Sequence, residues 1–236
     1  MSVYAFSDIH GNGILWNSIK NFLSPDDKAY FLGDAIDRGP DGFRIMKEMI
    51  ADPRFVYLKG NHELMMQNAL ETFKSTGNLY NEDMELWDYN GCFPTFMAWQ
   101  KDGSDFSWID KIKNLPLTTS YKNDEGMTFA MSHAGYDPGN IPTDEKQLVW
   151  DRNHIFKIPD INQMDPHVKI LHGHSPAPYY HQMIKIKDPI FSNELTENIL
   201  VYSAYGTKID IDSWTAKTKA ISLLNLDTYE VHIFKE

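Results

Sequence analysis

The N-terminal part of the chain repeats one order of segments three times: an apolar run, a polar loop containing glycine, and a stretch with helical spacing. The apolar runs lie at residues 1–6, 28–32 and 54–58, and their aromatic and β-branched residues are typical of strands. Strands that alternate with helices predict a layered α/β domain, in which polar loops gather at the carboxyl ends of parallel strands. The expected fold class is therefore α/β.

Two helices are expected between these strands. Residues 14–23 are mostly apolar at helical spacing, and a second helix is expected over residues 39–50, with Pro40 near its start. The apolar face of the second helix consists of Phe43, Met46, Met49 and Ile50. Such one-sided helices pack on a sheet and leave their polar faces in water.

Residues 64–116 differ from the rest because they are rich in Met, Trp, Phe and acidic residues with interrupted helical spacing. We expect a helical insertion there that covers the core. Strand-like runs then return at residues 127–135, 168–176, 198–204, 207–212, 219–226 and 229–234. This order predicts one domain over residues 1–236: two mixed sheets packed face to face, with helices outside.

Composition narrows the class of protein. Of 236 residues, 42% are hydrophobic and 23% charged, which is typical of a globular protein. No apolar run suits a bilayer span or a signal peptide, so neither is expected. The single cysteine, Cys92, excludes an intramolecular disulfide, suits a reducing cytoplasm and is expected to have a packing role. A net charge of −11 disfavours nucleic acid as a partner.

Five polar clusters follow strand-like runs, so their side chains can meet at one sheet edge. Their sequences are “SDIHGN”, “GDAIDRG”, “GNHE”, “SHAG” and “HGHSP”. The candidate residues are Asp8, His10, Asp34, Asp37, Arg38, Asn61, His62, Glu63, His133, His172 and His174. Carboxylate, amide and imidazole ligands without thiolates suit Mn, Fe, Zn or Ni, and one shared carboxylate can join two such ions.

Each cluster taken singly also has a plainer interpretation. Asp34 and Asp37 could cap turns or helices, and Arg38 could pair with either of them at the surface. His133 could be a core histidine bonded to a carbonyl, and Asn61 could occupy a left-handed turn. The occurrence of all five clusters after strands favours a common metal site over five separate structural roles.

Taken together, these stretches resemble the calcineurin-like metallophosphoesterases. Within that superfamily they resemble the phosphoprotein phosphatase branch, above all its small bacterial and phage serine/threonine phosphatases. The matching stretches “DIHGN”, “GDAIDRGPDG”, “LKGNHE”, “SHAG” and “HGHSP” occur in the family's order, and “LVWDRNH” resembles the segment that carries a second phosphate-binding arginine. The resemblance implies a four-layer α/β/β/α sandwich.

The resemblance also implies a role for each matching residue. The first of two divalent ions would be held by Asp8, His10 and Asp34. Asp34 would bridge to a second ion, which is completed by Asn61, His133 and His174. Phosphate would be bound by Arg38, Arg152 and Asn61, and the catalytic pair would be His62, as proton donor, with Asp37. Manganese is the first choice of metal, with iron, zinc or nickel as alternatives.

The implied reaction is hydrolysis of a phosphomonoester by a hydroxide that bridges the two metals. Pro176 stands where many family members have a second histidine, which disfavours a nuclease or phosphodiesterase. We expect a serine/threonine protein phosphatase that acts on a phosphoprotein or small phosphorylated substrate. The alternatives are a symmetrical dinucleoside tetraphosphate hydrolase and a catalytically silent metal-binding module.

The C-terminal part departs from the family pattern. Residues 209–224, “IDIDSWTAKTKAISLL”, keep Asp212 but lack the glycines of the family's “D-T-G…G-G” segment. We therefore expect a bulkier loop at the entrance for the substrate. His172 and Glu63 lie inside the motifs, but neither is assigned as a ligand; Glu63 is expected to have a structural role.

Overall fold

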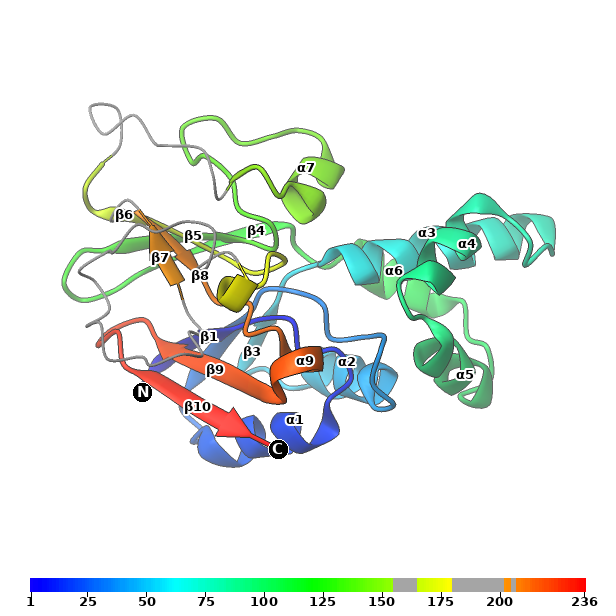
Figure 1. Cartoon of the computed structure of the whole chain (residues 1–236), viewed down its shortest axis with the longest axis horizontal. Helices are drawn as coiled ribbons and strands as arrows, with labels where there is room; N and C mark the ends of the chain where they lie inside the picture. Colours follow the sequence, from blue (N-terminus) through cyan, green and yellow to red (C-terminus); the bar gives the residue numbers. More distant parts are fainter. Residues whose placement is uncertain (155–164, 180–201, 205–206) are drawn as a thin grey trace.

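The computed structural model describes residues 1–154, 165–179, 202–204 and 207–236, and it contains two five-stranded sheets (Figure 1). The strand order in the first sheet is β10-β9-β1-β2-β3, and in the second β4-β5-β6-β8-β7. Both sheets combine parallel and antiparallel strand pairs, so both are mixed sheets, as expected from the order of the segments.

The first sheet is built around strand β1. This strand (Val3–Phe6) pairs in parallel with β2 (Lys28–Phe31), which pairs in parallel with β3 (Phe55–Tyr57). On its other side β1 pairs antiparallel with β9 (Ala220–Asn225), and β10 (Val231–Lys235) forms the edge. The first strand of the chain is thus the central strand of its sheet.

The second sheet has a parallel centre and two antiparallel edges. Strands β5 (Thr128–Ser132), β6 (Val168–His172) and β8 (Lys208–Asp210) run parallel to one another. The edges are β4 (Thr118–Lys122) and β7 (Tyr202–Ala204). Of the run expected at residues 198–204, residues 198–201 lie outside the described part of the chain.

Apolar residues fill the space between the sheets and the space under the helices. Val3 and Ala5 of β1 pack with Phe129 and Met131 of the second sheet. The alternate residues Tyr4 and Phe6 belong to the cluster on the other face, which includes Trp16 of α1 and Met46 of α2. Because β1 is covered on both faces, its continuous apolar sequence follows from its position.

Helices α1 (Gly13–Phe22) and α2 (Gly42–Ala51) cover the first sheet. Pro40 precedes α2, and Asp41 stands at its N-cap position without a side-chain capping hydrogen bond. Ile50 lies in the last turn with 38% exposure instead of on the buried face. On the second sheet, helix α7 (Glu145–Trp150) packs on Ala130 through Leu148 and Val149. A short helix α9 (Thr215–Thr218) precedes β9.

Four helices between β3 and β4 form a lobe that projects from the sandwich (Figure 1). They are α3 (Asn61–Thr76), α4 (Glu82–Tyr89), α5 (Phe93–Lys101) and α6 (Ser107–Lys113). The helices therefore begin at Asn61, before the expected boundary at residue 64, and extend sideways more than they cover the core. The lobe joins the main apolar cluster through Trp108, whose ring lies 5.2 Å from that of Phe43 in α2.

The described residues contain no helix that combines the length and apolar character of a membrane span. Cys92 is buried in the apolar cluster, and burial together with nearby Asp37 and Asp88 raises the pKa of its thiol to about 12. This agrees with a packing role, because a reactive cysteine needs a thiolate at neutral pH.

Glu48 links α1 to α2. Its carboxylate accepts hydrogen bonds from Trp16 Nε1 (2.8 Å), Lys20 Nζ (2.6 Å) and Arg44 Nη1 (2.7 Å). Partial burial raises the pKa of Glu48, but the hydrogen bonds outweigh it and lower the pKa from an ordinary 4.5 to about 2. The ionised form is therefore the one that stabilises the fold.

We predict that Glu48→Gln lowers the free energy of unfolding by about 1 kcal/mol at pH 7, because the side chain remains partly exposed. A lowered native pKa gives stability that is complete above pH 4.5 and is lost as the pH falls toward 2. The difference between the two proteins in urea denaturation should therefore shrink between about pH 4.5 and about pH 2. Glu71→Gln, at an exposed ion pair with Lys113, is the control; a difference independent of pH would contradict the prediction.

Candidate metal centre

The candidate site lies where parallel strands of both sheets end. Asp8 and His10 follow β1, and the residues after β2 include Asp34, Asp37 and Arg38. Asn61 and His62 form the first turn of α3 after β3, whereas His133 follows β5 and His174 follows β6. Carboxyl ends of parallel strands are a common position for sites in α/β folds, and here two sheets contribute to one centre.

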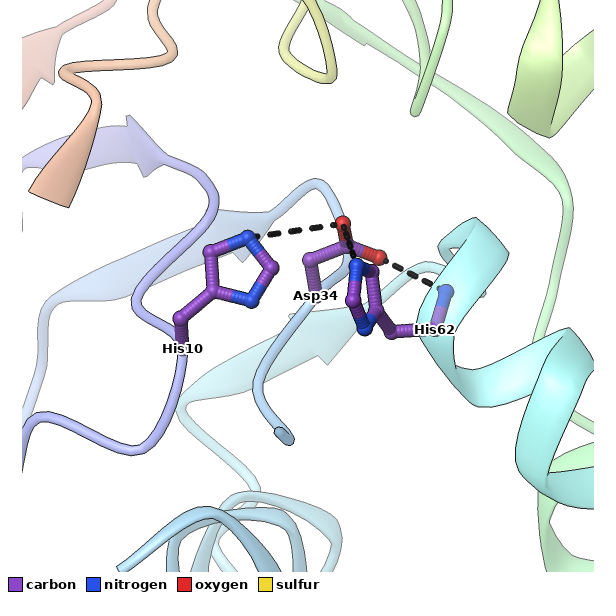
Figure 2. Close-up of side chains that lie close together, drawn as sticks. All are labelled: His10, Asp34 and His62. Carbon is purple, nitrogen blue, oxygen red and sulfur yellow. Dashed lines mark hydrogen bonds and ion pairs between the residues drawn. The ribbon is translucent and has the colours of Figure 1, made fainter. Parts of the chain in front are cut away.

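Asp34 is the centre of this arrangement (Figure 2). Its Oδ2 lies 3.7 Å from His10 Nε2 and 3.8 Å from His62 Nε2, and its Oδ1 lies 3.4 Å from His133 Nε2. Two buried triads result, His10–Asp34–His62 and Asp34–His133–His174. One carboxylate therefore faces two neighbouring sets of imidazoles.

Backbone carbonyl groups fix the orientation of two of the imidazoles. Nδ1–H of His10 donates to the carbonyl of Ile36 (3.1 Å), and Nδ1–H of His133 donates to the carbonyl of Leu32 (2.6 Å). In each ring Nε2 is thereby turned toward Asp34, as is usual for a histidine that binds a metal.

The ionised carboxylate of Asp34 is stabilised by positive charge on the histidines around it. Burial raises the pKa of Asp34, but His133 and His62 outweigh it and hold that pKa well below its ordinary value. Burial lowers the pKa of His133, but Asp34 outweighs it and raises that pKa to about 10. Burial lowers the pKa of His10 and of His174 well below the ordinary value, so both rings are neutral. A neutral imidazole is the form that ligates a metal.

The two triads fit a pair of divalent ions. Two ligands bound at about 2.0–2.2 Å to one ion lie roughly 3–3.6 Å apart, close to the separations around Asp34. Buried His174 Nε2 also has no hydrogen-bond partner among the described residues. The oxygen and nitrogen donors suit a first-row transition metal and do not single out one element.

Asp8 and Asn61 lie at the border of the triads. Asp8 Oδ1 is 3.8 Å from His10 Nε2, while its Oδ2 accepts hydrogen bonds from Ser7 Oγ and from the backbone N–H of His174. The first triad thus brings His62 beside His10 and Asp34, and Asp8 lies next to it, as close to His10 as His62 is to Asp34. Asn61 Oδ1 lies 2.9 Å from His133 Nε2 and 2.8 Å from His174 Nδ1, near both predicted partners.

His62 forms a pair with Asp37 that the helical lobe supports. Nδ1–H of His62 donates to Asp37 Oδ2 (2.7 Å), which also accepts from Trp87 Nε1 in α4 (2.8 Å). The backbone N–H of Asp37 donates to Thr95 Oγ1 in α5 (2.8 Å). Burial lowers the pKa of His62, but Asp34 and Asp37 outweigh it and raise that pKa.

Two arginines lie beside the triads. Arg38 donates from Nη1 to Nε2 of neutral His10 (2.7 Å), its Nη2 lies 3.1 Å from His62 Nε2, and its backbone N–H donates to the carbonyl of Gly91 (3.0 Å). Arg152 donates from Nη1 to the carbonyl of His174 (2.9 Å). Two guanidinium groups next to buried triads can bind the oxygens of a phosphate group.

Comparison with known proteins gives the same family as the chemistry of this centre. The sequence model of the calcineurin-like phosphoesterases matches residues 1–204. The chain belongs to this family. Its two mixed sheets and flanking helices are those of the family's solved structures. This confirms the α/β fold inferred from the order of the segments.

The sequence relatives of this phosphoesterase include both serine/threonine phosphatases and a dinucleoside tetraphosphatase. It is 30% identical over 163 residues, 66% of this chain and 70% of the relative, to serine/threonine-protein phosphatase 2 of Escherichia coli. It is 28% identical over 145 residues, 58% of this chain and 46% of the relative, to a symmetrical bis(5'-nucleosyl)-tetraphosphatase of Buchnera aphidicola. A solved structure provisionally described as a diadenosine tetraphosphatase has a TM-score of 0.63 and 13% identity, covering 98% of this chain and 92% of that chain.

The metal centre of the phosphoesterase opens into a cleft of about 360 Å³. Its walls include most of the predicted site residues: Asp8, His10, Asp34, Arg38, Asn61, His62, Arg152 and His174. Trp214 also lines the cleft and adopts a left-handed conformation with φ of 57°, which is unusual for a bulky residue. Trp214 belongs to the loop that was expected to be bulky, and that loop forms part of the wall of the cleft.

The backbone of the centre is strained. Among the described residues, ten other than glycine have positive φ, and six of them belong to the site: Asp8, His10, Asp34, Asp37, Arg38 and His174. Such conformations cost about 1–3 kcal/mol each and persist only where the surrounding structure holds them. Glycine is required beside them: a Cβ on Gly60 would overlap Asp34 Oδ1, and one on Gly173 would overlap Asp8 Oδ2.

Glu63 holds the loop that carries Asp34. Its buried carboxylate accepts the backbone N–H groups of Gly60 (2.8 Å), Asp34 (2.8 Å) and Ala35 (2.9 Å), and the hydroxyl of Tyr57 (2.8 Å). The sequence alone predicted only a structural role for Glu63, without naming the groups it would contact. One of these contacts could have been predicted from the sequence. Glu63 stands three residues after Gly60, the N-cap of α3, and a glutamate at that position commonly accepts a hydrogen bond from the N-cap amide.

We predict that Asp34→Asn removes metal from the protein. The amide offers one oxygen and no charge, so it can serve only one triad and weakens retention of both ions by at least about tenfold. Elemental analysis after dialysis should then show fewer than the two ions per chain expected of the unaltered protein. Asp102→Asn, which changes an exposed partner of Lys47, is the matched control. Equal metal content in both variants would contradict the shared role of Asp34.

Proposed function

We propose that this phosphoesterase is a metal-dependent phosphatase for phosphoserine and phosphothreonine in proteins, with two divalent ions and manganese as the first choice. The observation that supports the proposal most is the His62–Asp37 pair, in which a hydrogen bond of 2.7 Å holds Nδ1 and turns Nε2 toward Asp34. A serine or threonine alkoxide is a poor leaving group and needs a proton from such a group.

The charge of the centre suits a phosphomonoester dianion. Two divalent ions, held around Asp34 by its neighbouring ligands other than His62, would supply the charge that activates a water molecule and neutralises phosphate. Arg38 and Arg152 bind phosphate oxygens at the cleft and orient the ester, with Asn61 beside them. His62 gives its proton from Nε2 to the departing oxygen, and Asp37 stabilises the cationic ring from the other side.

A dinucleoside tetraphosphatase is the second candidate, because the Buchnera aphidicola relative bears that name. Its leaving group would be a nucleotide phosphate, which departs readily without a proton. A buried acid with a dedicated carboxylate and indole partner contributes less to that reaction. The His62–Asp37 pair therefore favours the protein phosphatase.

We predict that His62→Asn keeps both metal ions and loses about 10²- to 10⁴-fold in kcat on a phosphoserine peptide, the usual range for a general acid. The loss on p-nitrophenyl phosphate should be much smaller, because p-nitrophenolate leaves without protonation. Kinetics and elemental analysis of the same preparation test this. Loss of one metal ion would make His62 a ligand, as its place in the first triad allows.

The substrate class is tested by competition in the presence of manganese. We predict that a phosphoserine peptide has a higher kcat/KM than diadenosine tetraphosphate when the two are mixed. A preference for the dinucleotide would reverse the assignment. Failure to hydrolyse either substrate, with two metal ions bound, would identify a catalytically silent module.

A further inference from the structure

The turn between α4 and α5 joins the cleft to an exposed apolar surface. Asn90, in this turn, lines the cleft. On either side of it are large apolar residues that face water: Leu86 (48% exposed), Tyr89 (90%), Phe93 (67%) and Met97 (47%). We call these four residues the α4–α5 face. Their spacing of three and four residues places neighbouring pairs on the same side of each helix.

The opposite sides of these helices account for their packing in the lobe. Trp87 and Trp99 are completely buried and Thr95 nearly so. The fold of the lobe therefore does not need the α4–α5 face. Several large apolar side chains left in water together, next to a cleft, are characteristic of a surface that binds another molecule.

The negative charge of helix α4 indicates what kind of molecule can bind the α4–α5 face. Helix α4 carries four acidic residues, Glu82, Asp83, Glu85 and Asp88, and has no basic residue. A second copy of the chain on a two-fold axis would bring these acidic groups against their own copies, which is unfavourable. A polypeptide with both apolar and basic side chains complements the face in both respects.

We infer that the α4–α5 face binds the segment of the protein substrate that flanks the phosphorylated residue, and that it selects segments with basic and apolar side chains. This inference rests on the proposed phosphatase function. The α4–α5 turn and helix α4 also contact the proposed catalytic residues: the carbonyl of Gly91, in the turn, accepts from the N–H of Arg38 (3.0 Å), and Trp87, in α4, donates to Asp37 (2.8 Å). A chain bound on this face thus lies beside the groups that act on its phosphate.

The first experiment compares two phosphoserine peptides with p-nitrophenyl phosphate. One peptide carries Arg and Leu around the phosphoserine, and the other carries Glu and Ser. In the double variant Tyr89→Ser with Phe93→Ser, the ratio of kcat/KM for the basic peptide to kcat/KM for p-nitrophenyl phosphate should fall about tenfold, mainly through KM. Ile141→Ser, which changes another exposed residue (54%), should leave this ratio unaltered.

A charge reversal tests the same surface without touching its apolar residues. Glu82 and Glu85 are both exposed, and the double variant Glu82→Lys with Glu85→Lys should reverse the preference from the basic to the acidic peptide. Circular dichroism confirms that both double variants remain folded. If the double serine variant is unfolded, the peptide preference of the charge-reversal variant alone tests the inference.

The outcomes separate this inference from the proposed function. If the unaltered protein hydrolyses neither peptide, the proposed function is wrong. If it hydrolyses both peptides and the variants keep the kcat/KM ratios of the unaltered protein, the α4–α5 face does not bind substrate, while the phosphatase function stands. If gel filtration shows a dimer that the serine variant dissociates at unchanged ratios, the face is an interface between two copies and the inference is overturned.

Discussion

The structure depends on one buried carboxylate that two sets of imidazoles share. Both oxygens of Asp34 face histidines, at 3.4 to 3.8 Å, and all of these side chains are buried. A buried charge is tolerated only when it is compensated, so every loop around Asp34 must bring positive charge or hydrogen-bond donors. The left-handed turns, the required glycines and the four hydrogen bonds to Glu63 all serve this requirement.

The helical lobe is part of the centre and not an appendage to it. Trp87 and Thr95 fix the side chain and backbone of Asp37, and Gly91 fixes the backbone of Arg38. These contacts join residues fifty or more positions apart and cross from the sandwich into the lobe. We therefore expect a change in the lobe to alter the proposed proton donor, His62, and the proposed phosphate-binding residue, Arg38, without touching a metal ligand.

Much of the fold and the set of candidate residues could be predicted from the sequence. Apolar runs that end in Asp, His and Asn at the edge of a sheet are a local pattern, and so is the start of α1. The departures arise from long-range geometry. That His62 lies beside His10 and Asp34, or that Trp87 meets Asp37, depends on how separate elements meet in space. Left-handed backbone at Asp8 or Arg38 also has no compositional signal, because these residues usually adopt ordinary turns.

The central position of β1 has a consequence for biosynthesis. Tyr4 and Ala5 pair with Asn225 and Leu224, so β1 finds one of its two neighbours only after β9, far along the chain, has also been synthesised. Contacts between such distant residues form slowly. Between the synthesis of β1 and that of β9 the nascent chain therefore carries an apolar strand with one unpaired edge, and chaperones have their best opportunity to bind it during that interval.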